Sequence, residues 1–211
     1  MKPLVVKLGG STAGQEEMQG WIDVLATAAF PLVIVPGGGP FADHVRFSQK
    51  RLGYSDAAAH DMAILAMDQY GHVIAERHSR LCVVRSIQDM RQTWRARRVP
   101  VWLPSTMSLA APDIPRSWEV TSDSLAAWLC RKIDADTLLL VKQIDLRGEP
   151  ESVKTLVETG IVDPMLPRFL GDDTTLFVAG PQSLREELKQ LPLKEIPGCR
   201  IAQAALEGAV R

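Results

Sequence analysis

Cysteine is scarce in this chain of 211 residues, which contains only three, none of them in a CxxC pair. A disulfide framework needs paired cysteines and a zinc knuckle needs closely spaced ones, so neither is supported. We therefore expect Cys82, Cys130 and Cys199 to be buried thiols.

An excess of one charge is missing as well, because 24 Lys and Arg residues face 25 Asp and Glu residues and the formal net charge is -1. This balance gives no electrostatic footprint for nucleic acid or an anionic membrane. The most apolar run, Val24–Val35, is interrupted by Thr27 and Pro31 and is far shorter than the ~20 residues of a membrane span. The first residues do not resemble a signal peptide. We expect a cytoplasmic protein with a small-molecule partner and no nucleic-acid or membrane partner.

What is present is the composition of an ordinary globular protein, 46% hydrophobic and 23% charged. A chain of this length can bury roughly 70% of its unfolded surface around one core. We therefore predict a single domain over residues 1–211.

Short apolar runs alternate with amphipathic segments along the chain. The runs are typical of buried parallel strands and cover residues 4–6, 32–35, 81–84, 99–103, 137–141 and 176–178. Helical spacing predicts helices over residues 18–29, after Pro40, from near Ser55, after Ser86, after Thr121 and from Pro181. Residues 104–116, rich in Pro and Ser, are expected to form a loop. This alternation predicts an α/β fold with a mainly parallel sheet covered on both faces.

The first candidate site lies at the end of the first predicted strand, where Lys7 is followed by Gly9, Gly10 and Ser11. Ligands gather at this edge of a parallel sheet. Glycines let backbone N–H groups approach phosphate oxygens, and a lysine supplies a mobile positive charge. The order matches neither the Walker A nor the GxGxxG pattern. The alternative is a strand-end turn with a solvated lysine.

A glycine triplet, Gly37–Gly39, stands between the second predicted strand and a helix expected to open near Phe41. Without Cβ atoms a ligand can approach the backbone closely. Backbone N–H groups at a helix N-terminus also favour negative charge. A plain tight turn is the alternative interpretation.

Ser122 and Asp123 follow Thr121 at the start of another predicted helix. Helix capping and the helix dipole select such residues, which is the structural interpretation. The functional interpretation is that Asp123 holds catalytic lysines by charge-assisted hydrogen bonds. Their ammonium groups would then face the transferring phosphoryl group.

Taken in order, the segments VVKLGGS, VPGGGPFAD and VTSDSLAA resemble the amino acid kinase superfamily over most of the chain, to about Asp145. The resemblance implies a three-layer αβα sandwich that uses ATP and is usually dimeric, so a homodimer or higher homo-oligomer is expected. It implies that Lys7 and Asp123 are catalytic. The implied ATP-binding residues are Lys7, Gly9, Gly10 and Ser11, and the implied acceptor-binding residues are Gly37, Gly38, Gly39 and Ser122.

Within the superfamily, the short chain and the segments Ala58–Gly71 and Ile114–Leu129 resemble most the small kinases of methanofuran biosynthesis. Those enzymes phosphorylate 5-(aminomethyl)furan-3-yl methyl phosphate to its diphosphate, and this acceptor is the leading expectation. The alternatives are a kinase of the isopentenyl phosphate, carbamate or uridylate type, and a non-catalytic nucleotide- or anion-binding subunit of the same fold.

Two departures from the superfamily pattern leave the second cation of the site open. After the strand at residues 137–141, most members carry a Thr-Asp pair used around the nucleotide, whereas this chain has Lys142 and Gln143, which we keep as ATP-binding candidates. Residues 159–164 lack the usual Gly-Gly-Met segment and the lysine after it. Because phosphoryl transfer requires its negative charge to be offset, we predict that Lys142 is the second catalytic cation, with Arg168 as another candidate.

Magnesium is expected to be carried by the ATP phosphates, with no protein ligand cluster. The four histidines show no metal-binding spacing, so no role is assigned to His44, His60, His72 or His78. Met62, Met67, Trp94 and Trp128 are expected to face the core, with a place beside an aromatic acceptor as the alternative.

Overall fold

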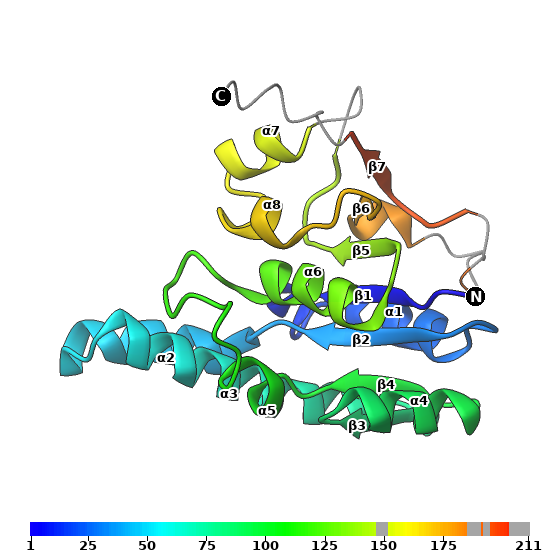
Figure 1. The fold of residues 1–211 in the computed structure, drawn as a ribbon, viewed down its shortest axis with the longest axis horizontal. Helices are drawn as coiled ribbons and strands as arrows, with labels where there is room; N and C mark the ends of the chain where they lie inside the picture. The colour runs from blue at the N-terminus through cyan, green and yellow to red at the C-terminus, as the bar shows by residue number, and fades with distance from the viewer. Residues whose placement is uncertain (147–151, 185–190, 192–194, 203–211) are drawn as a thin grey trace.

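A computed structural model describes residues 1–146, 152–184, 191 and 195–202 of the chain. Its centre is a seven-stranded sheet in the order β3-β4-β2-β1-β5-β6-β7 (Figure 1). Every neighbouring pair is parallel except β6 and β7. The strands are β1 (Leu4–Leu8), β2 (Leu32–Pro36), β3 (Leu81–Val84), β4 (Val99–Trp102), β5 (Thr137–Val141), β6 (Thr175–Ala179) and β7 (Cys199–Ile201). The predicted mainly parallel sheet is confirmed.

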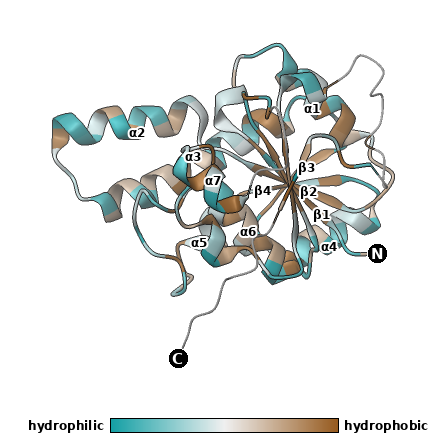
Figure 2. Cartoon of the chain, turned by 90° about the horizontal axis from the view of Figure 1, so that it is seen from above, coloured by the Kyte–Doolittle hydropathy of each residue, from teal (hydrophilic) through white to brown (hydrophobic). Residues whose placement is uncertain are grey.

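Helices cover both faces of this sheet and enclose a separate apolar core on each. In Figure 2 the strands form a brown fan with α1 on one side and α4 and α6 on the other. The α-helices are α1 (Glu17–Ala26), α2 (Gly39–Leu52), α3 (Asp56–Ala75), α4 (Ile87–Arg95), α5 (Ser105–Ser108), α6 (Ser122–Ile133), α7 (Val153–Glu158) and α8 (Leu166–Phe169), and the 3-10 turns are η1 (Gly10–Thr12) and η2 (Pro181–Ser183). This is the expected three-layer arrangement.

Alternation along β1 decides which layer each of its side chains enters, because successive strand residues point to opposite faces. Leu4, Val6 and Leu8 belong to the core beneath α1, whereas Val5 belongs to the core beneath α6. Lys7, two residues after Val5, therefore lies on the α6 side of the sheet at the carboxyl end of the strand.

The path of the chain reverses at β1. From β1 the chain proceeds through α1 to β2 on one side, and later returns to place β5 on the other side. Such a switch point opens a crevice beyond the carboxyl ends of the strands, where ligands of open α/β sheets bind. Strand order thus places the ends of β1, β2 and β5 around one opening.

A helical hairpin of α2 and α3 projects from the body of the molecule (Figures 1 and 2). Gly53, in the left-handed region with φ 71°, ends α2. Ser55 caps α3, since its side chain accepts a hydrogen bond from the N–H of Ala58. The long helix predicted to begin near Ser55 is confirmed.

Several local predictions are wrong, mainly where elements are short. Helix α1 ends at Ala26 rather than near Ala29, and the four-residue helix α5 interrupts the loop predicted at 104–116. Helices α7 and α8 and strand β7 were not predicted, because elements of three to six residues carry too little periodicity. Directly after Gly180 the structure has the turn η2 where the final helix was predicted to begin, and the rest of that predicted helix falls largely outside the described residues.

Two expectations about burial also need correction. Cys130 is buried, but Cys82 and Cys199 are only partly buried. Met62 is exposed on the outer surface of α3. Within the described ranges, none of the helices has the length and apolar character needed to cross a membrane.

Candidate active site

Two lysines and one aspartate form a buried ion bridge at the switch point. Lys7 Nζ lies 2.9 Å from Asp123 Oδ1, and Lys142 Nζ lies 2.5 Å from Asp123 Oδ2. The side chains of Lys7, Asp123 and Lys142 are 6%, 3% and 14% exposed. The three come from the end of β1, the first turn of α6 and the residue after β5. This geometry agrees with the functional interpretation of Asp123 as a carboxylate that holds two ammonium groups.

Burial alone would raise the pKa of Asp123, but the charges of Lys7 and Lys142 outweigh it and lower the pKa to about 2. The carboxylate therefore stays ionised at neutral pH. Burial, followed by repulsion from Lys7, lowers the pKa of Lys142 to about 8, although Asp123 and Asp163 act in the opposite direction. With both lysines protonated, the bridge carries a net charge of one positive unit in a poorly hydrated place, which favours an anionic ligand.

The two glycine segments lie directly against each other in front of this bridge. A Cβ atom on Gly10 would come within 2.9 Å of the Cα of Gly39, and one on Gly37 within 2.8 Å of the Cα of Gly10. Gly39 has φ 54°, a left-handed conformation that glycine adopts without strain. Helix α2 begins at this residue, slightly before the start expected near Phe41. These glycines are thus needed to seat one loop on the other, in addition to any ligand contact.

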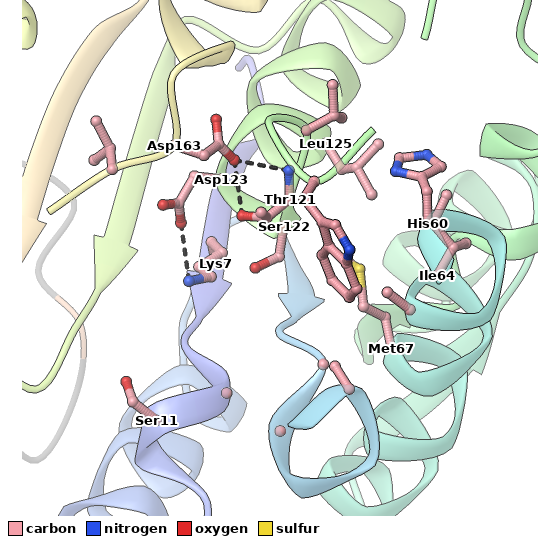
Figure 3. A pocket seen from close by; sticks show the side chains of 18 of the residues that line it. Lys7, Ser11, His60, Ile64, Met67, Thr121, Ser122, Asp123, Leu125 and Asp163 are labelled. Carbon is pink, nitrogen blue, oxygen red and sulfur yellow. Dashed lines mark hydrogen bonds and ion pairs between the residues drawn. The ribbon is translucent and has the colours of Figure 1, made fainter. Parts of the chain in front are cut away.

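A cavity of about 540 Å³ opens between the ion bridge, the glycine loops and the hairpin (Figure 3). Its charged end is lined by Lys7, Gly10, Ser11, Gly38, Gly39, Ser122, Asp123 and Lys142. The remainder of the wall combines apolar side chains, which include Ala63, Ile64, Met67, Trp118, Val120, Leu125, Ile161 and Val162, with the polar side chains of Asp43, Arg46, His60, Thr121 and Asp163. One space therefore joins a cationic end to a chamber with a mostly apolar wall.

The segment before α6 forms the far wall of this chamber because it is fastened to the α2–α3 hairpin. Arg116 Nε donates to Asp61 Oδ1 at 2.8 Å. Trp118 Nε1 donates to Gln49 Oε1 at 2.9 Å, and the guanidinium of Arg46 lies 4.6 Å from the centre of the Trp118 ring. Two contacts to Trp118 itself and one to nearby Arg116 thus hold this segment on the hairpin.

His60 is buried in α3 and lines the same chamber. Its Nδ1 lies 3.0 Å from the carbonyl oxygen of Ser117, which can only accept, so Nδ1 carries the proton. Burial lowers the pKa of His60, which keeps the ring neutral at neutral pH. No role was predicted for His60, since a single histidine on an apolar helix carries no spacing signal.

Asp163 fastens the start of α6. One of its oxygens, Oδ2, accepts from Thr121 N at 2.9 Å, from Thr121 Oγ1 at 2.8 Å and from Ser124 N at 3.1 Å, and Oδ1 accepts from the Ser124 hydroxyl. The side chain of Thr121 makes no capping hydrogen bond to its own helix. The capping role expected of Thr121 is thus taken by an aspartate 42 residues away, which sequence reasoning did not identify.

Most of the predicted site residues line the cavity, as given above. Gly9 and Gly37 are adjacent to lining residues without lining the cavity themselves, and Gln143 is not among its lining residues. Arg168 lies on the exposed side of α8, over the ring of Phe169, and does not reach the ion bridge. The geometry therefore favours Lys142 over Arg168 as the second cation.

No three His, Cys, Asp or Glu side chains are grouped as a metal site in the part of the chain that the structure describes. The oxygen ligands that magnesium prefers would thus have to come mainly from a bound ligand. Magnesium carried by ATP phosphates stays a prediction.

Comparison with known proteins gives results that agree with this geometry. A model of the amino acid kinase family matches residues 2–159. A protein of Methanocaldococcus jannaschii named 5-(aminomethyl)furan-3-yl methyl phosphate kinase is 32% identical over 114 residues, which span 54% of this chain and only 52% of that protein. The chain thus matches about half the length of this relative.

Two solved structures have the same fold. The uridylate kinase of Archaeoglobus fulgidus aligns with a TM-score of 0.69 at 19% identity, covering 96% of this chain and 100% of that one. The UMP kinase of Bacillus anthracis aligns with a TM-score of 0.70 at 15% identity, covering 97% of each chain. At these identities the likeness establishes the fold alone.

Proposed function

Because the chain belongs to the amino acid kinase family, we propose that it is an ATP-dependent kinase that transfers the γ-phosphoryl group to a small phosphate or carboxylate acceptor. The observation that carries this proposal is the Lys7–Asp123–Lys142 bridge, which faces two glycine loops across one cavity. A phosphoryl group in transfer spreads its charge over three oxygens, and catalysis consists mainly of positioning and charge stabilisation.

In the proposed mechanism, Lys7 and Lys142 stabilise the negative charge that develops as the acceptor oxygen attacks the γ-phosphorus in line. The bond from that phosphorus to the bridging oxygen breaks, and ADP leaves. Asp123 does not take up a proton, because its pKa of about 2 keeps it ionised. It holds the ammonium groups in place so that little reorganisation is needed during the reaction. Gly10, Gly38 and Gly39 lie where their backbone can approach phosphate oxygens.

The leading acceptor is 5-(aminomethyl)furan-3-yl methyl phosphate, which would give the diphosphate in methanofuran-type cofactor biosynthesis. Two observations support it: the name of the archaeal relative, and a chamber whose apolar wall includes Trp118 and Met67. An acceptor with a compact, flat body would bury apolar area against these side chains. Isopentenyl phosphate fits the same chamber chemistry, whereas carbamate would leave it largely unfilled.

The test is ADP formation from saturating Mg-ATP with a panel of acceptors: the furan methyl phosphate, isopentenyl phosphate, UMP and carbamate. The proposal expects turnover with the first and much slower turnover with UMP. A calorimetric titration with a non-hydrolysable ATP analogue and Mg²⁺ accompanies the panel. Tight binding of the analogue with no ADP from any acceptor would favour the non-catalytic nucleotide-binding subunit instead.

A further inference from the structure

The N-terminus of α6 is neutralised by a carboxylate from a distant segment. A helix begins with several backbone N–H groups that have no partner within the helix. Here the N–H groups of Thr121 and Ser124 both donate to Asp163, which is buried in the segment between α7 and α8. Asp163 thus satisfies two N–H groups at the helix start, while Ser122 and Asp123 of the same turn line the cavity.

The residues that Asp163 binds stand on either side of Asp123 in the sequence. Figure 3 shows Asp163 above the first turn of α6, with Thr121 held by two dashed contacts and Lys7 joined to Asp123 on the same turn. Since Thr121 and Ser124 are anchored through both backbone and hydroxyl groups, the intervening turn has little freedom to rotate.

We propose that Asp163 is a positioning residue for phosphoryl transfer, which clamps the first turn of α6 so that Asp123 stays between Lys7 and Lys142. The inference rests on the kinase function proposed above and adds a residue to it. Asp163 does not touch the two ammonium groups in the structure, and it acts through the helix turn. A shift of about 1 Å in Asp123 would misplace both lysines, and errors of that size can cost on the order of 100-fold in rate.

The charge of Asp163 gives the clamp a second, measurable effect. Lys142 is surrounded by Lys7 from β1, Asp123 from α6 and Asp163, and the negative charge of Asp163 raises the pKa of Lys142. Removing that charge should lower the pKa of Lys142 below about 8. Loss of the clamp would act in the same direction, because an Asp123 displaced from Lys142 would raise the pKa of Lys142 less.

The main test compares Asp163→Asn with a matched control, Ser86→Ala. Ser86 caps the N-terminus of α4 by accepting from the N–H of Asp89, but it lies outside the cavity wall.

We expect Asp163→Asn to lower kcat by about 10- to 100-fold, with a smaller change in KM for ATP. The alkaline limb of its kcat/KM profile should move to lower pH. Ser86→Ala should lose stability and keep its kcat. Equal kcat losses at equal loss of melting temperature in the two variants would overturn the proposal, as would an Asp163→Asn enzyme with the wild-type profile.

Two further measurements keep the inference testable if Asp163→Asn does not fold or if no acceptor is turned over. Thr121→Val removes one of the hydrogen bonds to Asp163 while leaving the carboxylate in place, and should give a smaller fall in kcat.

Competitive acetylation of lysines across pH, read by mass spectrometry, reports the pKa of Lys142 and does not require enzymatic activity. A lower Lys142 midpoint in Thr121→Val, which keeps the charge of Asp163, supports the clamp, because only a displaced Asp123 can produce it. A midpoint that falls in Asp163→Asn but not in Thr121→Val reports the charge alone and rejects the clamp, whereas absence of ADP from every acceptor rejects only the kinase function.

Discussion

Lys7 and Lys142 lie near the carboxyl ends of two adjacent parallel strands, with Lys7 opposite Leu140 in register and Lys142 two residues further along, and their environments differ. Lys7 is covered by α6 and the glycine loops, whereas Lys142 is somewhat more exposed at 14% and follows the last residue of β5. Both share the same aspartate, so each ammonium group is oriented by Asp123 and repelled by the other. At this scale the site is a balance of three charges, and removing any one of them changes the other two.

Replacing the lysines one at a time should separate their contributions. Lys7→Met should lower kcat/KM by on the order of 100- to 1000-fold, because a buried phosphoryl group loses its main cation. Lys142→Met should lower it by at least about tenfold. Lys154→Met, an exposed lysine on α7, is the control and should behave as wild type. If Lys142→Met kept the wild-type kcat with saturating Mg-ATP, Lys142 would not be the second cation.

The protonation of Lys142 predicts the pH dependence of the reaction. Its pKa in the free protein is lowered to about 8, so the ammonium form is present below that pH and is lost above it. We expect kcat/KM to fall as pH rises through about 8. The limb for kcat should lie at higher pH, because bound phosphates favour the charged lysine. Lys142→Arg should remove the limb, and a limb unchanged in that variant would assign it to another group.

At the scale of loops and secondary-structure elements, the two glycine loops leave no room for a side chain where they meet. Gly10 and Gly37 meet backbone to backbone, with no flexible side chain in between that could move aside. The loops also join the ends of neighbouring strands, since Gly37 N donates to Leu8 O at 2.9 Å and Gly9 N donates to Val141 O at 3.1 Å. Packing between elements therefore determines the local chemistry of the site.

Gly10→Ala should separate the loops, reducing both stability and ATP affinity. Gly53→Ala is the matched control, because Gly53 has open space around it and lies at the tip of the hairpin, away from the cavity. Its left-handed conformation should cost about 1 kcal/mol of unfolding free energy without changing KM for ATP. Urea unfolding and initial-rate kinetics on both variants provide the measurement. Equal KM values in the two variants would contradict the proposed contact between the first loop and the ATP phosphates.

For the whole molecule, the switch point joins both halves of the sheet around one cavity. ATP bound there would contact segments from β1, β2 and β5, so it should stabilise the fold as a unit. At a ligand concentration of about 100 Kd the stabilisation is roughly 2.7 kcal/mol, which raises Tm by several degrees in a chain of this size. The rise should be seen by differential scanning fluorimetry with Mg-ATP and should largely disappear in Lys7→Met. A full rise in that variant would place the nucleotide elsewhere.

The homodimer or higher oligomer expected from the family resemblance also belongs to this scale and stays a prediction. Sedimentation equilibrium would test it directly. A single species at the monomer mass would contradict it.

The local sequence determined most of the strands and the starts of α3 and α6, and it placed Lys7 and Asp123 at the ends of their elements, whereas their catalytic roles stay predictions from the family resemblance. These features depend on patterns within a few residues: apolar runs, capping residues, and a lysine or an aspartate at the end of an element. Such patterns predict which face or end of a helix or strand a residue occupies. The short elements α5, α7, α8 and β7 escaped prediction because periodicity needs more residues than they contain.

Only the tertiary structure decided which groups meet. Lys142 reaches Asp123 because β5 lies beside β1 rather than at an edge, and Asp163 caps α6 across 42 residues of chain. His60 lines the cavity because a carbonyl 57 residues away holds its ring. The free energy of these contacts depends on strand order and on the approach of separate segments, and local residue preferences carry no information about that approach.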